Sequence, residues 1–303
     1  MTIAVCVKVD DGVVLAADSA ATIMGQDSVY AVYNSANKIF NLHKRLPIGA
    51  IGWGLGGVGR TSMSTLAKDL RGRFMDAADE WYLESDYRMQ DVAERFGQFM
   101  FEAFSREASA MDPEAPDTGE EPEQDDVDPA GDEEAEGRTN DRAYMGFLVV
   151  GFSADGSGPE QYRIEIKDGA YTGAELERGP DQWGVSWGGD GEALCRLVLG
   201  FGTGLAEVFV QNLGVPDKQA WDAIEVIGQR LDARLCHPAM PLQDAIDLAQ
   251  FLADTSIGLS RFTPGWPTIG GPVDVAAISK HEGYKWIRRK HYYGADLNPE
   301  VPR

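Results

Sequence analysis

The pattern of apolar and polar positions begins with two short β-strands joined by a tight turn. Residues 2–9 and 12–17 are rich in Val, Ile and Ala, and Asp10, Asp11 and Gly12 between them are turn-forming residues. A three-residue loop pairs position 4 with position 18, which places Thr2 and Asp18 on the same face of the hairpin. A two-residue loop shifts the register by one and places them on opposite faces. The sequence leaves both registers open.

The rest of the chain changes several times between strand-like and helix-like spacing of apolar residues. Strands are predicted over residues 38–43, 47–53, 144–152, 161–166, 183–187, 273–278 and 284–287. Helices are predicted over residues 63–81, 89–104, 192 to about 201, 221–235 and 242–253. Hairpin-joined strands form antiparallel sheets, and grouped helices form separate layers. We therefore expect a single α+β domain over residues 1–303, with two antiparallel sheets face to face and helices on both outer sides.

Composition is that of a globular protein. With 303 residues, 43% of them apolar, the chain can bury a large core. It has no apolar run of about 18 residues that predicts a membrane span, and no signal-peptide pattern. Cys6, Cys195 and Cys236 are odd in number and widely spaced. This spacing argues against disulfides and against a structural zinc site, and it favours the reducing cytoplasm.

Much of the negative charge lies in one segment. The net charge is −22, and between Asp112 and Arg142 fourteen acidic residues face two arginines, which gives 2 − 14 = −12. The segment is rich in proline and poor in large apolar residues, so we expect a disordered acidic insertion at about 110–142. The charge makes nucleic acid an unsuitable partner. A polar tail is expected at about 289–303, and its basic and aromatic residues predict a solvated strand end or a docking surface for a neighbouring subunit's acidic loop.

Thr2 is the first candidate for chemistry. Threonine occurs at about one position in twenty, so its presence near the start carries little weight alone. If Met1 is removed, however, Thr2 has both a hydroxyl and a free α-amine. An α-amine with a pKa of about 7.7–8.0 can accept the hydroxyl proton near neutral pH. The four histidines have no triad spacing, and this chemistry needs no histidine, metal or organic cofactor.

Lys38 and Asp18 are candidates to support such a nucleophile. A lysine that faces inward beside the hydroxyl lowers the hydroxyl pKa through its positive charge. A buried lysine needs a carboxylate partner, and Asp18 is the nearest candidate in the sequence. The alternative interpretations are that Asp18 caps the turn after the hairpin and that Lys38 is exposed, as most charged residues are.

The glycine-rich stretch of residues 52–61 lies between a predicted strand and a predicted helix. Backbone amides at such a position can stabilise an oxyanion in a transition state. Gly52, Gly54 and Gly57 also match a dinucleotide-binding pattern, which is a weak signal alone. Residues 54–61 match a phosphate-binding loop except that Arg60 replaces its lysine. Hairpin-connected strands argue against that loop, which belongs to a βαβ unit.

Together these motifs resemble proteasome β-type subunits, which are N-terminal-nucleophile hydrolases with bacterial ring and open-ring homologues. The matching segments are TIAV (2–5), DGVVLAADS (11–19), NKIF (37–40) and IGAIG (48–52). The resemblance implies a four-layer αββα fold, with Thr2 as nucleophile and its amine as base. It implies that Lys38 tunes the hydroxyl, that Asp18 positions Lys38 and that the Gly52 amide lines the oxyanion hole. It also implies a homo-oligomer, as a ring or open ring, peptide or protein substrates, and an unfoldase ATPase as a candidate partner.

Several positions depart from the family pattern. Ala20 stands where the family has an arginine, and Gly188 stands where it has a serine. The family's Asp-x-x-Ser-Gly-Gly element is reduced here to Ile269, Gly270 and Gly271, preceded by Trp266. Asp254, at the end of a predicted helix, is a candidate for the displaced aspartate, with Ser256 or Ser260 nearby. These departures favour the bacterial homologues over a classical proteasome.

The sequence thus predicts a cytoplasmic threonine-nucleophile amide hydrolase, a peptidase that forms a homo-oligomer and binds neither membrane nor nucleic acid. The first alternative is a catalytically inactive scaffold of the same fold, because serines and an arginine of the family are missing. The second is a nucleotide-binding protein that uses residues 54–61.

Overall fold

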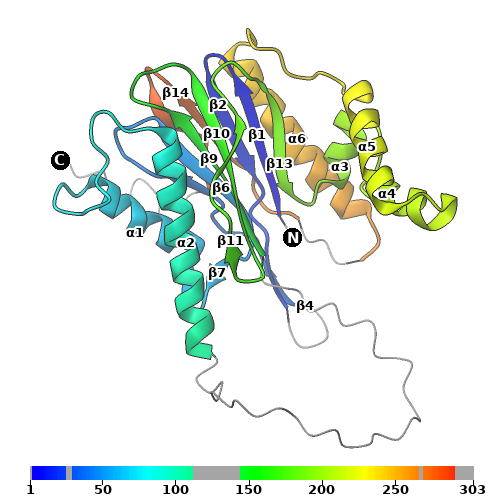
Figure 1. Cartoon of the computed structure of the whole chain (residues 1–303), viewed down its shortest axis with the longest axis horizontal. Coiled ribbons are helices and arrows are strands. Elements are labelled where there is room, and N and C mark those ends of the chain that lie inside the picture. The colour runs from blue at the N-terminus through cyan, green and yellow to red at the C-terminus, as the bar shows by residue number, and fades with distance from the viewer. Residues whose placement is uncertain (1, 25–28, 112–143, 266–268, 291–303) are drawn as a thin grey trace, which may run out of the picture.

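The computed structural model describes residues 2–24, 29–111, 144–265 and 269–290. The predicted acidic insertion from residue 112 onward and the predicted tail from residue 291 onward lie outside the described residues. The described chain is a mixed α and β structure in which the strands form antiparallel sheets (Figure 1).

One antiparallel sheet has the strand order β13-β1-β2-β14-β15. Its strands are β1 (Ile3–Val9), β2 (Gly12–Ala17), β13 (Gly184–Gly189), β14 (Asp274–Ser279) and β15 (Gly283–Arg288). β1 and β2 confirm the predicted hairpin, and Val9 pairs with Gly12 across the turn. The loop therefore has two residues, Asp10 and Asp11, so the register in which Thr2 and Asp18 share a face does not occur.

The second antiparallel sheet has the order β11-β10-β9-β6-β5, with β12 also paired to β10. Its strands are β5 (Ile39–Asn41), β6 (Ile48–Gly54), β9 (Tyr144–Phe152), β10 (Pro159–Lys167), β11 (Ala170–Tyr171) and β12 (Glu175–Arg178). Two small hairpins were not predicted, and they consist of β3 (Ala21–Met24) with β4 (Val29–Tyr33) and β7 (Gly57–Val58) with β8 (Thr61–Ser62).

The helices are α1 (Met63–Met75), α2 (Met89–Met111), α3 (Glu192–Leu194), α4 (Leu205–Glu207), α5 (Asp217–Leu231) and α6 (Leu242–Phe262), with π-helical segments η1 (Cys195–Leu199) and η2 (Val208–Asn212). The predicted helix over 63–81 ends at Met75, because Asp76 adopts an extended conformation. Within the described ranges, none of the helices combines the length and apolar character needed to cross a membrane.

Three hydrophobic clusters connect these elements. The first packs α1 and α2 against the second sheet, and its largest side chains include Phe74, Phe96 and Phe147. The second packs α6 against β1, β2 and β14. The third contains residues of both sheets, such as Leu15 from β2 and Leu148 from β9, and therefore lies between them. Figure 1 shows α1 and α2 on one side of the strands and α6 on the other.

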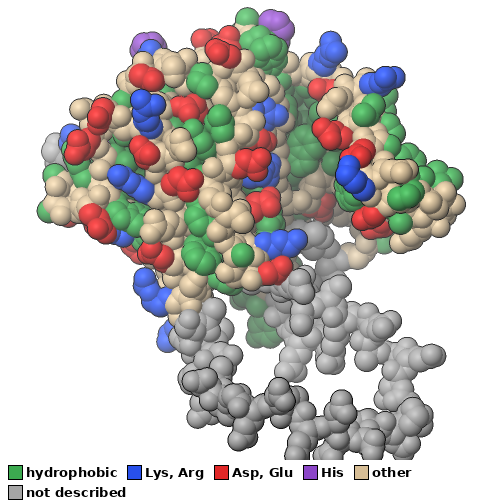
Figure 2. Space-filling view, in the orientation of Figure 1, with side chains coloured by type: hydrophobic (Ala, Val, Ile, Leu, Met, Phe, Trp, Pro, Cys, Tyr) green, Lys and Arg blue, Asp and Glu red, His purple; other side chains and the backbone are tan. Residues whose placement is uncertain are grey.

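The segment from α3 to α5 projects beyond α6 (Figure 1). Several of its large apolar side chains are exposed, with Trp221 at 57% and Leu213 at 65%. Figure 2 shows hydrophobic side chains at the outer end of this unit. The unit lies apart from the cavity described next.

Candidate active site

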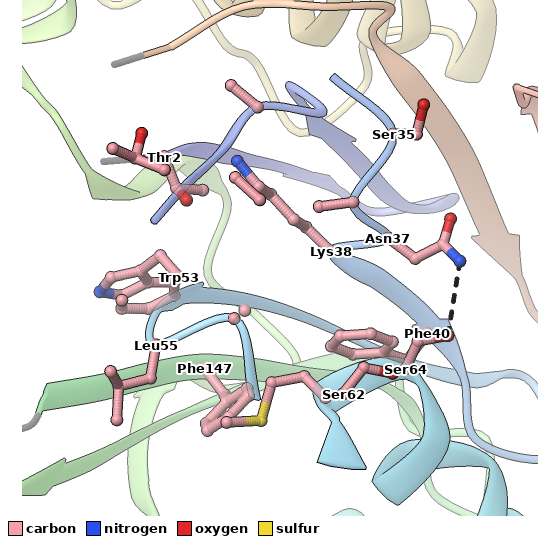
Figure 3. A pocket seen from close by; sticks show the side chains of 18 residues that line it. Thr2, Ser35, Asn37, Lys38, Phe40, Trp53, Leu55, Ser62, Ser64 and Phe147 are labelled. Carbon is pink, nitrogen blue, oxygen red and sulfur yellow. Dashed lines mark hydrogen bonds between the residues drawn. The ribbon is translucent and has the colours of Figure 1, made fainter. Parts of the chain in front are cut away.

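A cavity of about 280 Å³ opens at the ends of β1, β5 and β6. Its wall includes Thr2, Lys38, Trp53 and Gly54, together with residues of β3 and the start of α1. Figure 3 shows the amine of Lys38 extending toward Thr2 on one side of this space. Thr2 is 5% exposed and Lys38 is 8% exposed, so both are held within the wall. The structure thus brings together two of the residues predicted from the sequence.

Asp18 connects these two residues from behind the cavity wall. Its Oδ1 accepts a hydrogen bond from Lys38 Nζ at 2.5 Å and another from the backbone amide of Ile3 at 3.1 Å. Its Oδ2 accepts from the amides of Ala20 at 3.1 Å and Gly270 at 3.0 Å. Ile3 follows Thr2 directly, so one carboxylate fixes both the backbone beside Thr2 and the ammonium group that points toward it. Multiple donors of this kind fix the position and orientation of the carboxylate.

The segment around Gly270 therefore contributes through its backbone. The amide of Gly270 donates to Asp18, and its carbonyl accepts from the amide of Ser19 at 2.9 Å. This part of the predicted family element reaches the site, although it lacks the serine. Residues 266–268, which include Trp266, lie outside the described residues.

A second buried ion pair, which was not predicted from the sequence, lies next to the first. Lys290 Nζ forms an ion pair with Asp274, and the two side chains are 9% and 3% exposed. The same ammonium donates to Ser19 Oγ at 2.7 Å, and that hydroxyl donates to the carbonyl of Pro272 at 2.6 Å. Ser19 follows Asp18 directly, so the ammonium group of Lys290 contacts the residue next to the first ion pair. A cation thus reaches this region from the end of β15, although Ala20 stands in the place of the family's arginine.

The two ion pairs influence the pKa of Lys38. Burial lowers the pKa of its ammonium group, the charge of Asp18 and the hydrogen bond to it raise the pKa, and the positive charge of Lys290 lowers it. The net direction is downward. Lys38 therefore loses its proton more readily than an exposed lysine does.

The backbone of Thr2 is fixed by the chain that follows β13. Its carbonyl accepts from the amide of Asp190 at 2.7 Å. Gly189 has φ = 86°, and a Cβ there would lie 1.9 Å from the carbonyl oxygen of Thr2. The close approach of these two backbones therefore requires glycine at this position.

Trp53 forms one side of the cavity and explains another departure from the family pattern. A Cβ on Gly188 would lie 2.3 Å from the indole, and a Cβ on Gly146 would lie 2.2 Å from it. The indole N–H donates to the hydroxyl of Tyr144 at 3.1 Å. A serine at position 188 would collide with this ring, so the glycine there makes room for Trp53.

The predicted role of the Gly52 amide does not agree with its hydrogen bonding. This amide donates to the carbonyl of Lys38 at 2.9 Å, as part of the pairing of β5 with β6. The group is therefore occupied in this structure. Amides alternate in direction along a strand, so the amide of Gly54 points to the same side, beyond the start of β5. Gly54 also lines the cavity.

Asp254 is not part of this site, and that prediction is wrong. Helix α6 continues to Phe262 instead of ending near Asp254, and the Asp254 side chain lies on the exposed face of the helix. Its contact is with Gln250 Nε2 at 3.5 Å. Ser256 is buried, but its hydroxyl donates to the carbonyl of Leu252 within the same helix. The residues of α6 that pack in the cluster with the sheet include Ala245, Ala249 and Ala253.

The glycine-rich stretch does not have the surroundings of a phosphate-binding loop. β6 is antiparallel to both of its neighbours, and the stretch itself forms the small β7–β8 hairpin before α1 begins. A phosphate-binding loop instead connects a strand to a helix within a βαβ unit. In the described ranges there is no group of three or more His, Cys, Asp or Glu side chains that could hold a metal ion.

No family model matches the chain, and no curated protein matches it. Among solved structures, the chain is similar to the Gly-1 mutant of Anbu from Hyphomicrobium sp. strain MC1, with a TM-score of 0.48 and 14% identity. That alignment covers 96% of this chain and 86% of the other.

These comparisons correct the identification made from the sequence. Membership of the proteasome β-type family was inferred from short motifs within residues 2–60, yet no family model matches. Short motifs in a hairpin and its neighbouring strands are therefore insufficient to place this chain in that family. The geometry of Thr2, Asp18 and Lys38 stands independently of that identification.

Proposed function

We propose that the chain is a threonine-nucleophile amide hydrolase that acts on peptides. The observation that carries this proposal is the buried pair of Lys38 and Asp18 at the cavity that Thr2 lines, with Asp18 also holding the amide next to Thr2. A buried ion pair is a weak source of stability, since its desolvation offsets most of its attraction. Its position at a cavity with a hydroxyl nucleophile supports a chemical role.

The reaction begins with the removal of Met1, which frees the α-amine of Thr2. This amine takes the proton of the Thr2 hydroxyl as the oxygen attacks the amide carbonyl. The ammonium of Lys38 favours the developing alkoxide by its positive charge. The tetrahedral intermediate collapses to an ester on Thr2, the leaving amine takes the proton, and water then cleaves the ester with the α-amine as base.

The oxyanion of the tetrahedral intermediate needs a backbone donor at the cavity. The amide of Gly54 is the candidate that we propose in place of that of Gly52. Its direction along β6 and its place in the cavity wall support this role.

The test is the intact mass of the full chain before and after treatment with a peptide epoxyketone, which closes a ring with a hydroxyl and an adjacent free amine. We expect loss of Met1 and one adduct on Thr2. Thr2→Ala should give no adduct, and Thr2→Ser should keep it. An unmodified wild-type protein that has lost Met1, or an adduct that survives Thr2→Ala, would exclude this mechanism.

A second candidate is a catalytically inactive scaffold of the same fold. The observation in its favour is that the Gly52 amide is engaged with the carbonyl of Lys38. The same mass measurement separates the two candidates, because a scaffold forms no adduct at Thr2.

We further propose that the two sheets and their helices form a four-layer αββα sandwich and that the protein self-associates. The three hydrophobic clusters, one between the sheets and one on each outer face, support the four layers. The exposed apolar side chains between α3 and α5 support self-association. Sedimentation of the full chain as a monomer at micromolar concentration would contradict the second part.

A further inference from the structure

A second, smaller cleft of about 50 Å³ lies between α1 and the end of β15. It adjoins the Thr2 cavity, since Asn37, Phe40 and Ser64 line both. A hydrogen bond of 3.4 Å from Asn37 Nδ2 to Ser64 Oγ crosses the wall between them (Figure 3). A buried water needs roughly 10–15 Å³. The cleft therefore has room for a group about the size of a carboxylate with a few waters.

The polar lining of this cleft consists of donors and cations. Lys68 and Arg71 project from α1, and Arg289 follows β15. Asn41 and Ser64 add an amide and a hydroxyl, and the described residues that line the cleft include no Asp or Glu. A cleft of this composition is complementary to a carboxylate, which accepts several hydrogen bonds and carries a negative charge.

Among the described residues, neither Arg71 nor Arg289 forms an ion pair with a carboxylate. The pKa of Arg71 is lowered mainly by burial and further by the positive charge of Arg289. The two guanidinium groups therefore repel each other. The Arg289 guanidinium lies 4.7 Å from the centre of the Trp286 ring, which holds it over the cleft. A bound anion would relieve this repulsion.

We propose that this cleft binds a carboxylate of the substrate, so that Thr2 hydrolyses acidic peptides. The inference rests on the proposed function for the position of the scissile bond, but the anion site itself does not. Arginine pairs suit carboxylates because the planar guanidinium donates two parallel hydrogen bonds. The remaining surface of this acidic protein repels such peptides, so the local positive charge concentrates them beside the Thr2 cavity.

The first experiment measures binding without turnover. Acetyl-tetraglutamyl amide and acetyl-tetraglutaminyl amide are titrated by calorimetry into the full chain carrying Thr2→Ala, at low salt. We expect the Glu peptide to bind at least tenfold more tightly than the Gln peptide. The variant with Arg71→Met and Arg289→Met should lose this preference, while Arg71→Lys with Arg289→Lys should keep part of it. Raising the salt concentration should weaken Glu-peptide binding.

A matched control removes a positive charge elsewhere. Arg230 is exposed in the last turn of α5, on the opposite side of the molecule from α1 in Figure 1. Arg230→Met should leave the affinity for the Glu peptide unchanged. Equal affinities for the two peptides, or a wild-type affinity in the Arg71→Met and Arg289→Met variant, would overturn the proposal.

The second experiment separates this proposal from the proposed function. A neutral peptide epoxyketone should modify Thr2 equally in the wild type and in the Arg71→Met and Arg289→Met variant. If the adduct forms and the Glu preference is absent, the anion site is wrong while the nucleophile stands. If the Glu preference is present and no adduct forms on a chain that has lost Met1, the anion site stands and the proposed nucleophile is wrong.

Discussion

The ammonium of Lys38 lies 2.5 Å from Oδ1 of Asp18, and both side chains are buried beside Thr2. The carboxylate receives three backbone amides in addition to this ammonium group. Removal of one partner of a buried pair leaves the other partner charged without compensation, which is costly.

Asp18→Asn should destabilise the protein and abolish modification of Thr2. It leaves the buried Lys38 ammonium unpaired, so we expect the free energy of unfolding to fall by about 3–5 kcal/mol. Urea denaturation measures this change, and intact mass after epoxyketone treatment measures the modification. The double variant with Lys38→Met should recover part of the stability but none of the reactivity. Full reactivity in Asp18→Asn would show that the pair is only structural.

Lys290→Met should move the alkaline limit of Thr2 modification to higher pH. The charge of Lys290 lowers the pKa of Lys38, so its removal raises that pKa. The protonated Lys38 that the mechanism requires then persists to higher pH. The measurement is the rate of epoxyketone modification as a function of pH. Lys285→Met, which removes an exposed charge from the same strand β15, serves as the control and should leave the profile unchanged. The substitution also removes the partner of Asp274. A loss of stability alone, however, would not change the pH above which modification of Thr2 slows.

Gly188→Ala should destabilise the protein by about 1–3 kcal/mol, the usual range for overpacking. The new Cβ would lie 2.3 Å from the indole of Trp53, which cannot move away because Gly146 lies close to the same ring. Thermal or urea unfolding measures the change. Gly72→Ala is the matched control, since its Cβ would meet nothing within 4 Å, and alanine is a better helix former than glycine. An unchanged stability in Gly188→Ala would contradict the packing described for Trp53.

The native protein should resist thiol reagents at Cys6. Burial raises the pKa of this thiol to about 12, so very little thiolate forms at neutral pH. Cys195 and Cys236 are partly exposed. Titration with a chromogenic disulfide should therefore detect at most two thiols in the native protein and a third after denaturation. Three fast-reacting thiols in native protein would mean that the two sheets separate readily at Cys6.

Local patterns in the sequence predicted the elements better than their ends and contacts. The alternation of residues 2–17 predicted the hairpin, but the loop length depended on conformations that Asp10, Asp11 and Gly12 allow in more than one way. The pairing of Lys38 with Asp18 could be predicted because a buried lysine needs a carboxylate partner. The helix containing Asp254 was predicted to end too early, because apolar spacing does not report how far the exposed face continues.

Contacts between distant segments left no local signal. Lys290 reaches Ser19 across most of the sequence, and nothing around either residue indicates the contact. The bond from Gly52 to the Lys38 carbonyl depends on the register of β5 against β6, which hydrophobic alternation alone did not determine. The short β3–β4 hairpin has too few residues to show a clear period.

The order in which these residues leave the ribosome has a consequence for the cell. The ribosome makes Thr2, Asp18 and Lys38 well before Gly270 and Lys290, which complete the hydrogen bonds around Asp18 and Ser19. A nascent chain therefore carries Thr2, the nucleophile that we propose, long before these contacts can form. Under the proposed mechanism, this order of synthesis delays the reactivity of Thr2 until the segments around Gly270 and Lys290 have been added.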